Sequence, residues 1–305
     1  MYISVIITAY NRKEFLLNAI KSVLNQTLDK KYYEIIVIKN FEDKNIDNFI
    51  SGNNIKQILM DGTLGRFLDK GISEAKGEII SFLDDDDLFC ENKLNIVYEE
   101  FKKDRNIVYY HNQYIPINRH GKTINASSIN TSLDFNMSSI SIKKSIVKIN
   151  KPDKINGSPD TLLCLYALES KKRMIKGKER LTYYMLHNST SNTVSNNFEG
   201  HKKFIFTVSD LFLNNYIFFK NLFHSKKTIN FLNSRITGMQ IDKYIFGANE
   251  VPDKLINYIM NNFDSLKRRI ILFLLCILII IYPGSREYIS NKMWNIYRKS
   301  RSEII

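Results

Sequence analysis

The residues best suited to chemistry are four consecutive carboxylates, Asp84 to Asp87, which follow the apolar, strand-like segment Glu78–Leu83. Four like charges this close repel one another unless a cation lies among them. In an extended segment alternate side chains share a face, so we expect Asp84 and Asp86 to converge while the other two turn elsewhere. Mg²⁺ and Mn²⁺ prefer oxygen ligands, including phosphate oxygens and water. The run therefore predicts a divalent cation that holds a nucleotide diphosphate. The alternative is an acidic loop whose last member, Asp87, caps a helix over 92–102.

The elements around these aspartates alternate between strands and helices. The period of apolar residues predicts strands over 3–8, 34–38 and 78–83, and helices over 15–24 and 64–75. Near-continuous apolar strands separated by helices predict an α/β fold with a Rossmann-like, mostly parallel sheet covered by helices on both faces. Ligands of such sheets bind at the carboxyl ends of the strands. Thr8–Arg12 and Asp84–Asp87 both follow strands, so we expect them to face one crevice.

The length and composition of the chain limit the number of domains that it can form. A chain of 305 residues with 44% hydrophobic content can bury one substantial core and a smaller second unit. A change in composition divides the chain into a domain over 1–195 and a helical, aromatic and basic region over 196–305. The three cysteines are far apart and odd in number, which indicates neither a disulfide framework nor a clustered metal site. The first residues do not read as a secretory signal, so we expect the amino-terminal domain to remain in the cytoplasm.

The basic excess is concentrated in the carboxy-terminal part. Residues 201–305 hold 16 Lys and Arg against 7 Asp and Glu, within a chain of net charge +13. The excess accompanies the apolar segment 270–282, which is shorter than the roughly 20 residues of a straight membrane span. Flanking basic residues favour a re-entrant or interfacial membrane segment, with an oligomer interface or a core helix as the alternative. Because the charge accompanies the apolar segment, nucleic acid is not an expected partner.

Four segments in order resemble glycosyltransferase family 2: Ser4–Arg12, Ser22–Thr27, Glu34–Val37 and Ala75–Asp87. The resemblance covers roughly the first hundred residues, and the order and spacing of the segments are more specific than any one of them. It implies a GT-A fold and an inverting transferase that uses a nucleotide-diphosphate sugar.

The resemblance also implies roles for individual residues. Thr8, Ala9, Tyr10 and Arg12 would line the nucleoside pocket, and Asp84 and Asp85 would bind the nucleotide sugar. Asp86 is the expected ligand of Mn²⁺ or Mg²⁺. His187 resembles a late family histidine that approaches the diphosphate or the metal, although a structural histidine is the alternative.

Two segments depart from the family pattern. After the second strand the chain reads Lys39–Glu42, so the usual base-reading aspartate is missing. Asn40, or Asp43 from a shifted loop, is expected to contact the base instead. The family's Ala-Arg-Asn-x-Gly segment is altered as well, and Arg66 is expected to replace its arginine. These changes leave the identity of the nucleotide open.

The transfer needs a base that deprotonates the acceptor hydroxyl. The segment Gly157–Leu163 resembles the family's position for this carboxylate, which makes Asp160 the expected base. The alternative for Asp160 is ordinary helix capping beside a proline. Asp153 is the neighbouring candidate for the base.

The sequence thus predicts a metal-dependent inverting glycosyltransferase at the cytoplasmic face of the membrane, acting on a hydroxyl or phosphate of a lipid-linked or glycan acceptor. One alternative is a catalytically silent, membrane-bound subunit that binds nucleotide sugars, because Lys39 and Asn40 replace the usual acids. Another is a sugar-phosphate nucleotidyltransferase. Such enzymes carry a glycine-rich phosphate loop after the first strand, and none follows Thr8.

Overall fold

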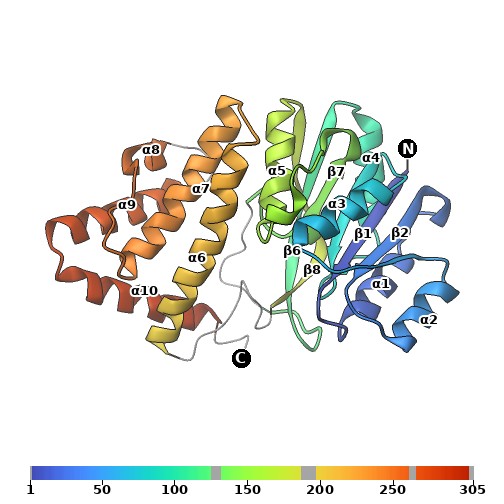
Figure 1. The fold of residues 1–305 in the computed structure, drawn as a ribbon, viewed down its shortest axis with the longest axis horizontal. Coiled ribbons are helices and arrows are strands. Elements are labelled where there is room, and N and C mark those ends of the chain that lie inside the picture. The colour runs from blue at the N-terminus through green and yellow to red at the C-terminus, as the bar shows by residue number, and fades with distance from the viewer. Residues whose placement is uncertain (1, 125–131, 187–196, 261–265, 302–305) are drawn as a thin grey trace. The chain divides into compact units, whose positions relative to one another are not determined.

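The computed structural model describes residues 2–124, 132–186, 197–260 and 266–301. The chain forms two compact units, residues 1–185 and 186–305, which are described separately below (Figure 1). The predicted domain boundary at residue 195 falls outside the described residues.

The amino-terminal unit alternates strands and helices as the apolar periods predict. Its strands are β1 (Ile3–Ala9), β2 (Tyr33–Lys39), β3 (Lys56–Leu59), β4 (Ile79–Asp84), β5 (Leu88–Phe89), β6 (Ile107–Asn118), β7 (Ile140–Lys143) and β8 (Arg173–Leu186). Its helices are α1 (Leu16–Leu24), α2 (Lys44–Gly52), α3 (Leu64–Glu74), α4 (Lys93–Lys103) and α5 (Pro159–Glu169). Short 3-10 turns are η1 (Lys30–Tyr32), η2 (Met137–Ser139), η3 (Lys144–Ile146) and η4 (Pro152–Lys154).

The strands form one mixed sheet in the order β3-β2-β1-β4-β7-β6-β8-β5. The half that carries the predicted site is parallel: β1 pairs with β2 and β4, and β2 pairs with β3. Beyond β4 the sheet becomes antiparallel, since β7 runs against both β4 and β6. Thr8 lies opposite Asp84 in the register of β1 and β4. The carboxyl ends of these two strands therefore meet at one edge, as the sequence predicts.

Helices cover both faces because the central strands are apolar on both sides. Ile3, Val5 and Ile7 belong to the core that includes α1 and α4. The alternate residue Ile6 faces α3. Gly71 permits this close approach, since a Cβ there would lie 2.8 Å from a side-chain carbon of Ile6. The fold class is therefore confirmed, with an antiparallel half that the first hundred residues do not reveal.

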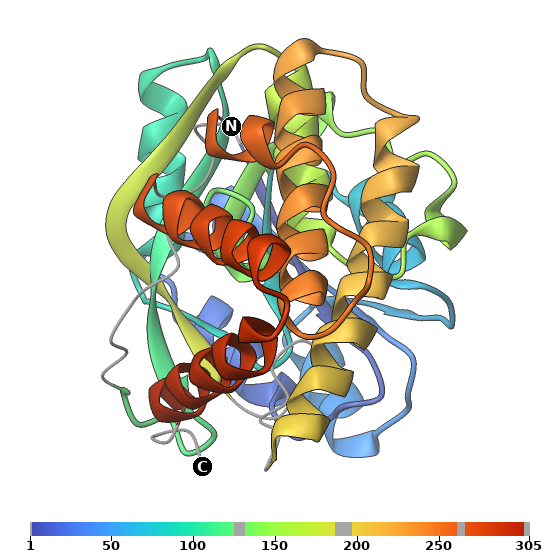
Figure 2. The same ribbon diagram turned by 90° about the vertical axis from the view of Figure 1, so that its left-hand side faces the viewer.

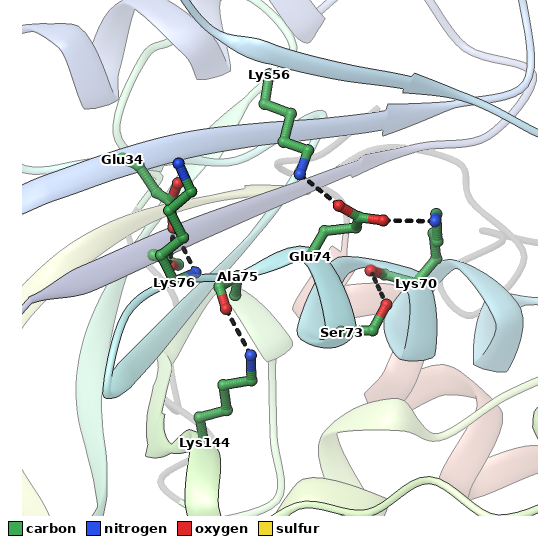
Figure 3. A network of polar contacts seen from close by, with 9 residues as sticks. Glu34, Lys56, Lys70, Ser73, Glu74, Ala75, Lys76 and Lys144 are labelled. Carbon is green, nitrogen blue, oxygen red and sulfur yellow. Dashed lines mark hydrogen bonds and ion pairs between the residues drawn. The ribbon is translucent and has the colours of Figure 1, made fainter.

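A polar network lies away from the predicted site, near the amino end of β4. Lys56 and Lys70 both pair with Glu74 at the end of α3, the latter at 2.6 Å (Figure 3). The backbone after α3 is held as well, because Lys144 Nζ donates to the Ala75 carbonyl at 2.5 Å and the Lys76 N–H donates to Glu34 at 2.6 Å. This network stabilises the connection that leads into β4.

The carboxy-terminal unit is helical. Its helices are α6 (Phe198–Lys220), α7 (Lys226–Ile245), α8 (Leu255–Met260), α9 (Leu266–Ile281) and α10 (Ser285–Arg301). The long helices α6 and α7 pack against each other, and α9 and α10 complete the unit (Figure 2). Within the described residues no helix is both long and apolar enough to cross a bilayer.

The predicted apolar segment 270–282 forms most of α9, and its two faces differ. Leu272, Cys276 and Ile279 are buried in the core of the unit. Leu274 and Leu278 on another face are exposed. The helix therefore serves as a core helix on one side, and a face of exposed apolar side chains remains on the other.

Candidate active site

The aspartate run begins at the end of β4 and continues as a turn. Asp84 is the last residue of the strand, and the Asp87 N–H donates to the Asp84 carbonyl at 3.2 Å. The chain therefore bends where the extended-segment prediction assumed strict alternation. That prediction is wrong for Asp85, which does not turn away from Asp86, because both carboxylates contact the same guanidinium group.

Arg12 provides that guanidinium group from the loop after β1. Its Nε donates to Asp85 Oδ2 at 2.9 Å, its Nη2 also contacts Asp85 Oδ1, and Nη2 lies 2.8 Å from Asp86 Oδ2. Burial alone would lower the pKa of Arg12, but the hydrogen bond to Asp85 and the charges of Asp86 and its neighbours raise it above its usual range. Arg12 thus places a fixed positive charge beside the carboxylates of the aspartate run.

One guanidinium group does not compensate all of the negative charge. Burial, followed by the charges of Asp86 and Asp85, raises the pKa of Asp84 well above its ordinary value. Burial also raises the pKa of Asp85, although Arg12 opposes this effect. The charge of Asp160 also contributes to the raised pKa of Asp84. These carboxylates lie close enough to repel one another, which makes the region favourable for a further cation.

Asp87 does not cap the following helix. The N-cap of α4 is Asn92, and Asp87 Oδ1 instead accepts a hydrogen bond from the Met185 N–H at 2.9 Å. The capping alternative is wrong because the chain passes through β5 before α4 begins. Asp87 is almost completely buried, and burial raises its pKa. It ties the aspartate turn to the end of β8.

A buried lysine lies beneath the turn, and sequence reasoning missed it. Lys93 is fully buried, with its Nζ 3.9 Å from the centroid of the Phe89 ring. Its ammonium group donates to the Ser138 carbonyl and, at 3.1 Å, to Thr182 Oγ1. Ser138 Oγ in turn accepts from the Asp84 N–H at 2.9 Å. Burial lowers the pKa of Lys93 to about 7. These contacts join α4, β8 and the Ser138 segment directly to the first aspartate.

A pattern in the sequence could have revealed this lysine. Lys93, Val97 and Phe101 are spaced four residues apart along α4, and all three are buried. Residues at this spacing share one helix face. A lysine in line with buried apolar residues at the start of a helix indicates a buried ammonium group.

The other predicted nucleotide contacts differ in exposure. Tyr10 is 56% exposed, and its ring meets Phe67 edge-on with 5.8 Å between ring centroids. Thr8 is largely buried, and the Ala9 side chain lies completely within the core. The whole residue, backbone included, therefore presents no surface to a ligand in this structure. Tyr10 is the accessible aromatic surface at this edge of the sheet.

The altered segment after β2 forms two separate sets of contacts. Asn40 and Asn11 exchange hydrogen bonds at 2.7 Å, from the Asn11 N–H to Asn40 Oδ1 and from Asn40 Nδ2 to Asn11 Oδ1. Lys39 is fully buried and pairs with Asp47 at 2.8 Å. Asp43 caps α2 and pairs with Lys13 at 3.2 Å. Asn40 thus lies next to the Thr8–Arg12 loop, whereas both carboxylate oxygens of Asp43 are already engaged.

The predicted base lies at the start of α5. Asp160 Oδ1 accepts from the Thr161 N–H at 2.8 Å. Thr161 Oγ1 donates to Asp134 Oδ2 at 3.2 Å, so a second buried carboxylate that the sequence did not suggest stands beside this helix. Asp153 is exposed instead and lies 3.5 Å from Arg66 Nε. The structure therefore brings Asp160 near the aspartate turn and pairs Asp153 with Arg66.

The aspartate turn offers the kind of ligand atom that a divalent cation prefers. Asp84 and Asp86 supply carboxylate oxygens, which Mn²⁺ and Mg²⁺ prefer, and phosphate oxygens with water commonly complete such sites. Over the described ranges, no three His, Cys, Asp or Glu side chains are grouped so that they could hold a metal ion by themselves. His187, the other predicted ligand, lies outside the described residues.

The sequence profile described as Glycosyl transferase family 2 matches residues 4–156, which include both strand ends and the aspartate turn. The chain belongs to glycosyltransferase family 2. The residues that match the family 2 profile include the edge of the sheet where β1 and β4 end side by side.

Known proteins resemble this family 2 chain over limited regions. An uncharacterized glycosyltransferase of Rickettsia bellii is 34% identical over 139 residues, which are 42% of this chain and 19% of that protein. The poly(ribitol-phosphate) beta-N-acetylglucosaminyltransferase TarP of Staphylococcus aureus is 29% identical over 167 residues, 49% of this chain and 51% of TarP. The chain thus spans about a fifth to a half of the length of these relatives.

A solved structure shows the same fold over nearly the whole chain. The mannosyltransferase PcManGT from Pyrobaculum calidifontis, in complex with GDP-Man and Mn²⁺, has a TM-score of 0.55 and 10% sequence identity. The likeness covers 98% of this chain and 86% of PcManGT. At this identity the likeness concerns the GT-A fold alone.

Proposed function

We propose that the protein is an inverting, metal-dependent glycosyltransferase that moves a sugar from a nucleotide-diphosphate donor to a hydroxyl of a phosphate-bearing acceptor. The observation that carries this proposal is the convergence of Arg12, Asp84 and Asp86 where β1 and β4 end side by side. A cation bound there would stabilise the negative charge of the departing diphosphate. The similarity to TarP, named for poly(ribitol-phosphate), supports an acceptor that carries phosphate.

Residues at the ends of β1 and β2 have separate proposed roles in binding the donor. Tyr10 offers its exposed ring to the nucleobase, and Asn40 offers its amide beside the same loop. Arg12 holds Asp85 and Asp86 in place, so Asp86 would offer a preoriented carboxylate to a bound cation. Preorganised charges of this kind contribute to catalysis because they need not reorient during the reaction.

Asp160 is the proposed base. It would accept the proton of the acceptor hydroxyl while the oxygen forms a bond to the anomeric carbon and the bond from that carbon to the diphosphate oxygen breaks. Attack opposite the leaving group inverts the anomeric centre. The position of Asp160 at the start of α5, near Asp84, supports this role.

A thermal-shift panel of UDP-, GDP- and dTDP-sugars with and without Mn²⁺ tests the donor and the metal. A ligand at 100 times its Kd stabilises the folded state by about 2.7 kcal/mol. We expect one nucleotide to raise Tm only with Mn²⁺, and Asp86→Asn to abolish this rise. Glu74→Gln is the matched control, since Glu74 belongs to the separate network in Figure 3. A rise that persists in Asp86→Asn would contradict the role of Asp86.

The same preparation distinguishes an enzyme from a silent subunit. Transfer or slow hydrolysis of the stabilising donor, followed by release of the nucleotide diphosphate, is expected from the wild-type protein. Donor binding without either reaction, in the presence of phosphate-bearing acceptors, would favour the silent nucleotide-sugar-binding subunit.

We also propose that the protein works at an anionic membrane surface, where a lipid-linked acceptor would be found. The exposed face of α9 supports this, because Leu274 and Leu278 lie one helical turn apart and Lys267 and Arg268 precede them. Basic residues beside an apolar face are attracted to anionic head groups. The proposed side of the membrane is the cytoplasmic one, where the nucleotide-sugar donor would be available to the enzyme.

Vesicle co-sedimentation with phosphatidylglycerol tests this face. Leu274→Gln should weaken binding roughly tenfold, because it removes one side chain of apolar area from the lipid contact. Ile217→Gln is the control, since Ile217 on α6 is 56% exposed and Leu274 is 57% exposed. Equal loss in both variants, or none in either, would exclude α9 as the contact surface.

A further inference from the structure

A basic cavity lies within the carboxy-terminal unit, between α7 and α8. It has a volume of about 670 Å³, within the range of about 300–1,000 Å³ that is usual for ligand sites. Lys226, Asn230, Ser234 and Thr237 line it from α7. Their spacing of three or four residues places them on one helix face. Lys254 lies opposite, immediately before α8.

The charge of the lining is entirely positive. Lys226, Lys227 and Lys254 contribute three ammonium groups, and none of the described lining residues is acidic. Lys226 and Lys227 are also the first two residues of α7, a helix of 20 residues capped by Ser225. The amino-terminal end of a helix attracts anions through its free N–H groups and its dipole. The helix end and the three side chains therefore favour the same sign of ligand.

A buried hydroxyl in the lining provides an independent indication of a ligand. Ser234 is 4% exposed, and its Oγ has no hydrogen-bond partner among the described residues. A buried polar group without a partner is unfavourable. Asn230 and Thr237 lie one helical turn before and after it on the same wall. A ligand rich in oxygen atoms would supply partners to this wall as well as charge to the lysines.

We propose that this cavity binds a phosphodiester chain, so that the carboxy-terminal unit holds a polyol-phosphate acceptor. The chemical class follows from three ammonium groups spread over two segments, because compact cations suit several phosphate groups better than one planar carboxylate. The identity of the chain as the acceptor rests on the proposed function. A chain held at one site and reacting at another has a raised effective concentration at the reacting site.

The experiment measures binding of a fluorescent glycerol-phosphate oligomer by anisotropy at low salt. Lys226→Gln with Lys254→Gln should weaken binding roughly tenfold, as expected for the loss of two exposed ion pairs. Lys203→Gln with Lys292→Gln is the matched control, since these exposed lysines carry the same charge in the same unit outside the cavity. The control pair should change binding less than about twofold.

Ser234→Ala separates a ligand site from a merely basic surface. It should weaken oligomer binding about threefold without lowering Tm, because the hydroxyl it removes has no partner within the described part of the unliganded protein. Equal weakening by the cavity pair and the control pair would overturn the proposal. So would loss of phosphatidylglycerol vesicle binding in the cavity pair with unchanged oligomer binding, since that result assigns the cavity to lipid head groups.

The Mn²⁺-dependent donor shift, measured on the same preparations, reports the proposed function separately. If the oligomer binds through the cavity while no donor raises Tm, the glycosyltransferase proposal fails and the phosphodiester site stands. If the donor raises Tm and the cavity pair leaves oligomer binding unchanged, the phosphodiester site alone is excluded.

Discussion

The pairing of Arg12 with the aspartate run is open to a quantitative test by a double-mutant cycle of Arg12→Gln and Asp85→Asn. The Asp85 side chain is 5% exposed and that of Arg12 is 32% exposed. Removing one partner of a buried ion pair costs about 3–5 kcal/mol. Because Arg12 is about one third exposed, we expect the lower value, about 3 kcal/mol, for Arg12→Gln.

The double variant should lose less stability than the two single variants together, because the second substitution no longer breaks a pair. We expect a coupling free energy of at least about 1.5 kcal/mol. For a unit of this size, about 3 kcal/mol corresponds to a fall in Tm of roughly 6–12 °C. Arg12 also contacts Asp86, and this contact is present in both proteins that retain Arg12, the wild type and Asp85→Asn. Its contribution therefore cancels from the coupling free energy.

Urea unfolding followed by far-ultraviolet circular dichroism gives the four free energies of unfolding. Trp294, the single tryptophan, lies in the carboxy-terminal unit, so its fluorescence reports that unit separately. The pair Lys56 and Glu74 provides a control cycle with a more exposed carboxylate, and its coupling should be smaller. A coupling below about 0.5 kcal/mol for Arg12 and Asp85 would refute the argument, since that is the value of an ordinary surface pair.

Three further outcomes follow from the structure. Asp160→Asn should lower kcat by a factor of about 10²–10⁴ and leave the donor-induced rise in Tm unchanged. Asp153→Asn should change kcat little, and steady-state kinetics on both variants checks this. Gly65→Ala should destabilise by about 1–3 kcal/mol in urea unfolding, because a Cβ there would lie 2.3 Å from a backbone oxygen, whereas Gly52→Ala has open space and should not destabilise. Hydrogen bonding to two lysines lowers the pKa of Glu74 to about 2. The ionised Glu74 carboxylate therefore stabilises the folded state fully above pH 4.5, and this stabilisation is lost as the pH falls toward 2. Glu74→Gln should flatten the stability profile in that window, and an unchanged acid midpoint would contradict it.

The local pattern of apolar residues was sufficient to predict several strands and helices of the first hundred residues, although it did not predict α2 or β3. β1, β2 and β4 and helices α1 and α3 lie where the periods indicate, because each of these elements buries side chains at its own repeat. The convergence of Thr8 and Asp84 also followed, since parallel strands must end at one edge. The antiparallel half did not follow, because its strands pair across long connections that local periodicity does not encode.

By itself the sequence determined the fold class, the edge of the sheet that carries the aspartates, and the basic, apolar character of the tail, because these depend on residue type and local spacing. The tertiary structure decided which charges meet. Arg12 and Asp85 are separated by 73 positions, and Lys93 and Thr182 by 89. It also decided that Asp85 joins Asp86 rather than turning away, because a turn replaces the strand there. The partners of Lys93, Ser138 and Thr182, and the cavity beside α7 depend on packing between segments, which no local pattern specifies.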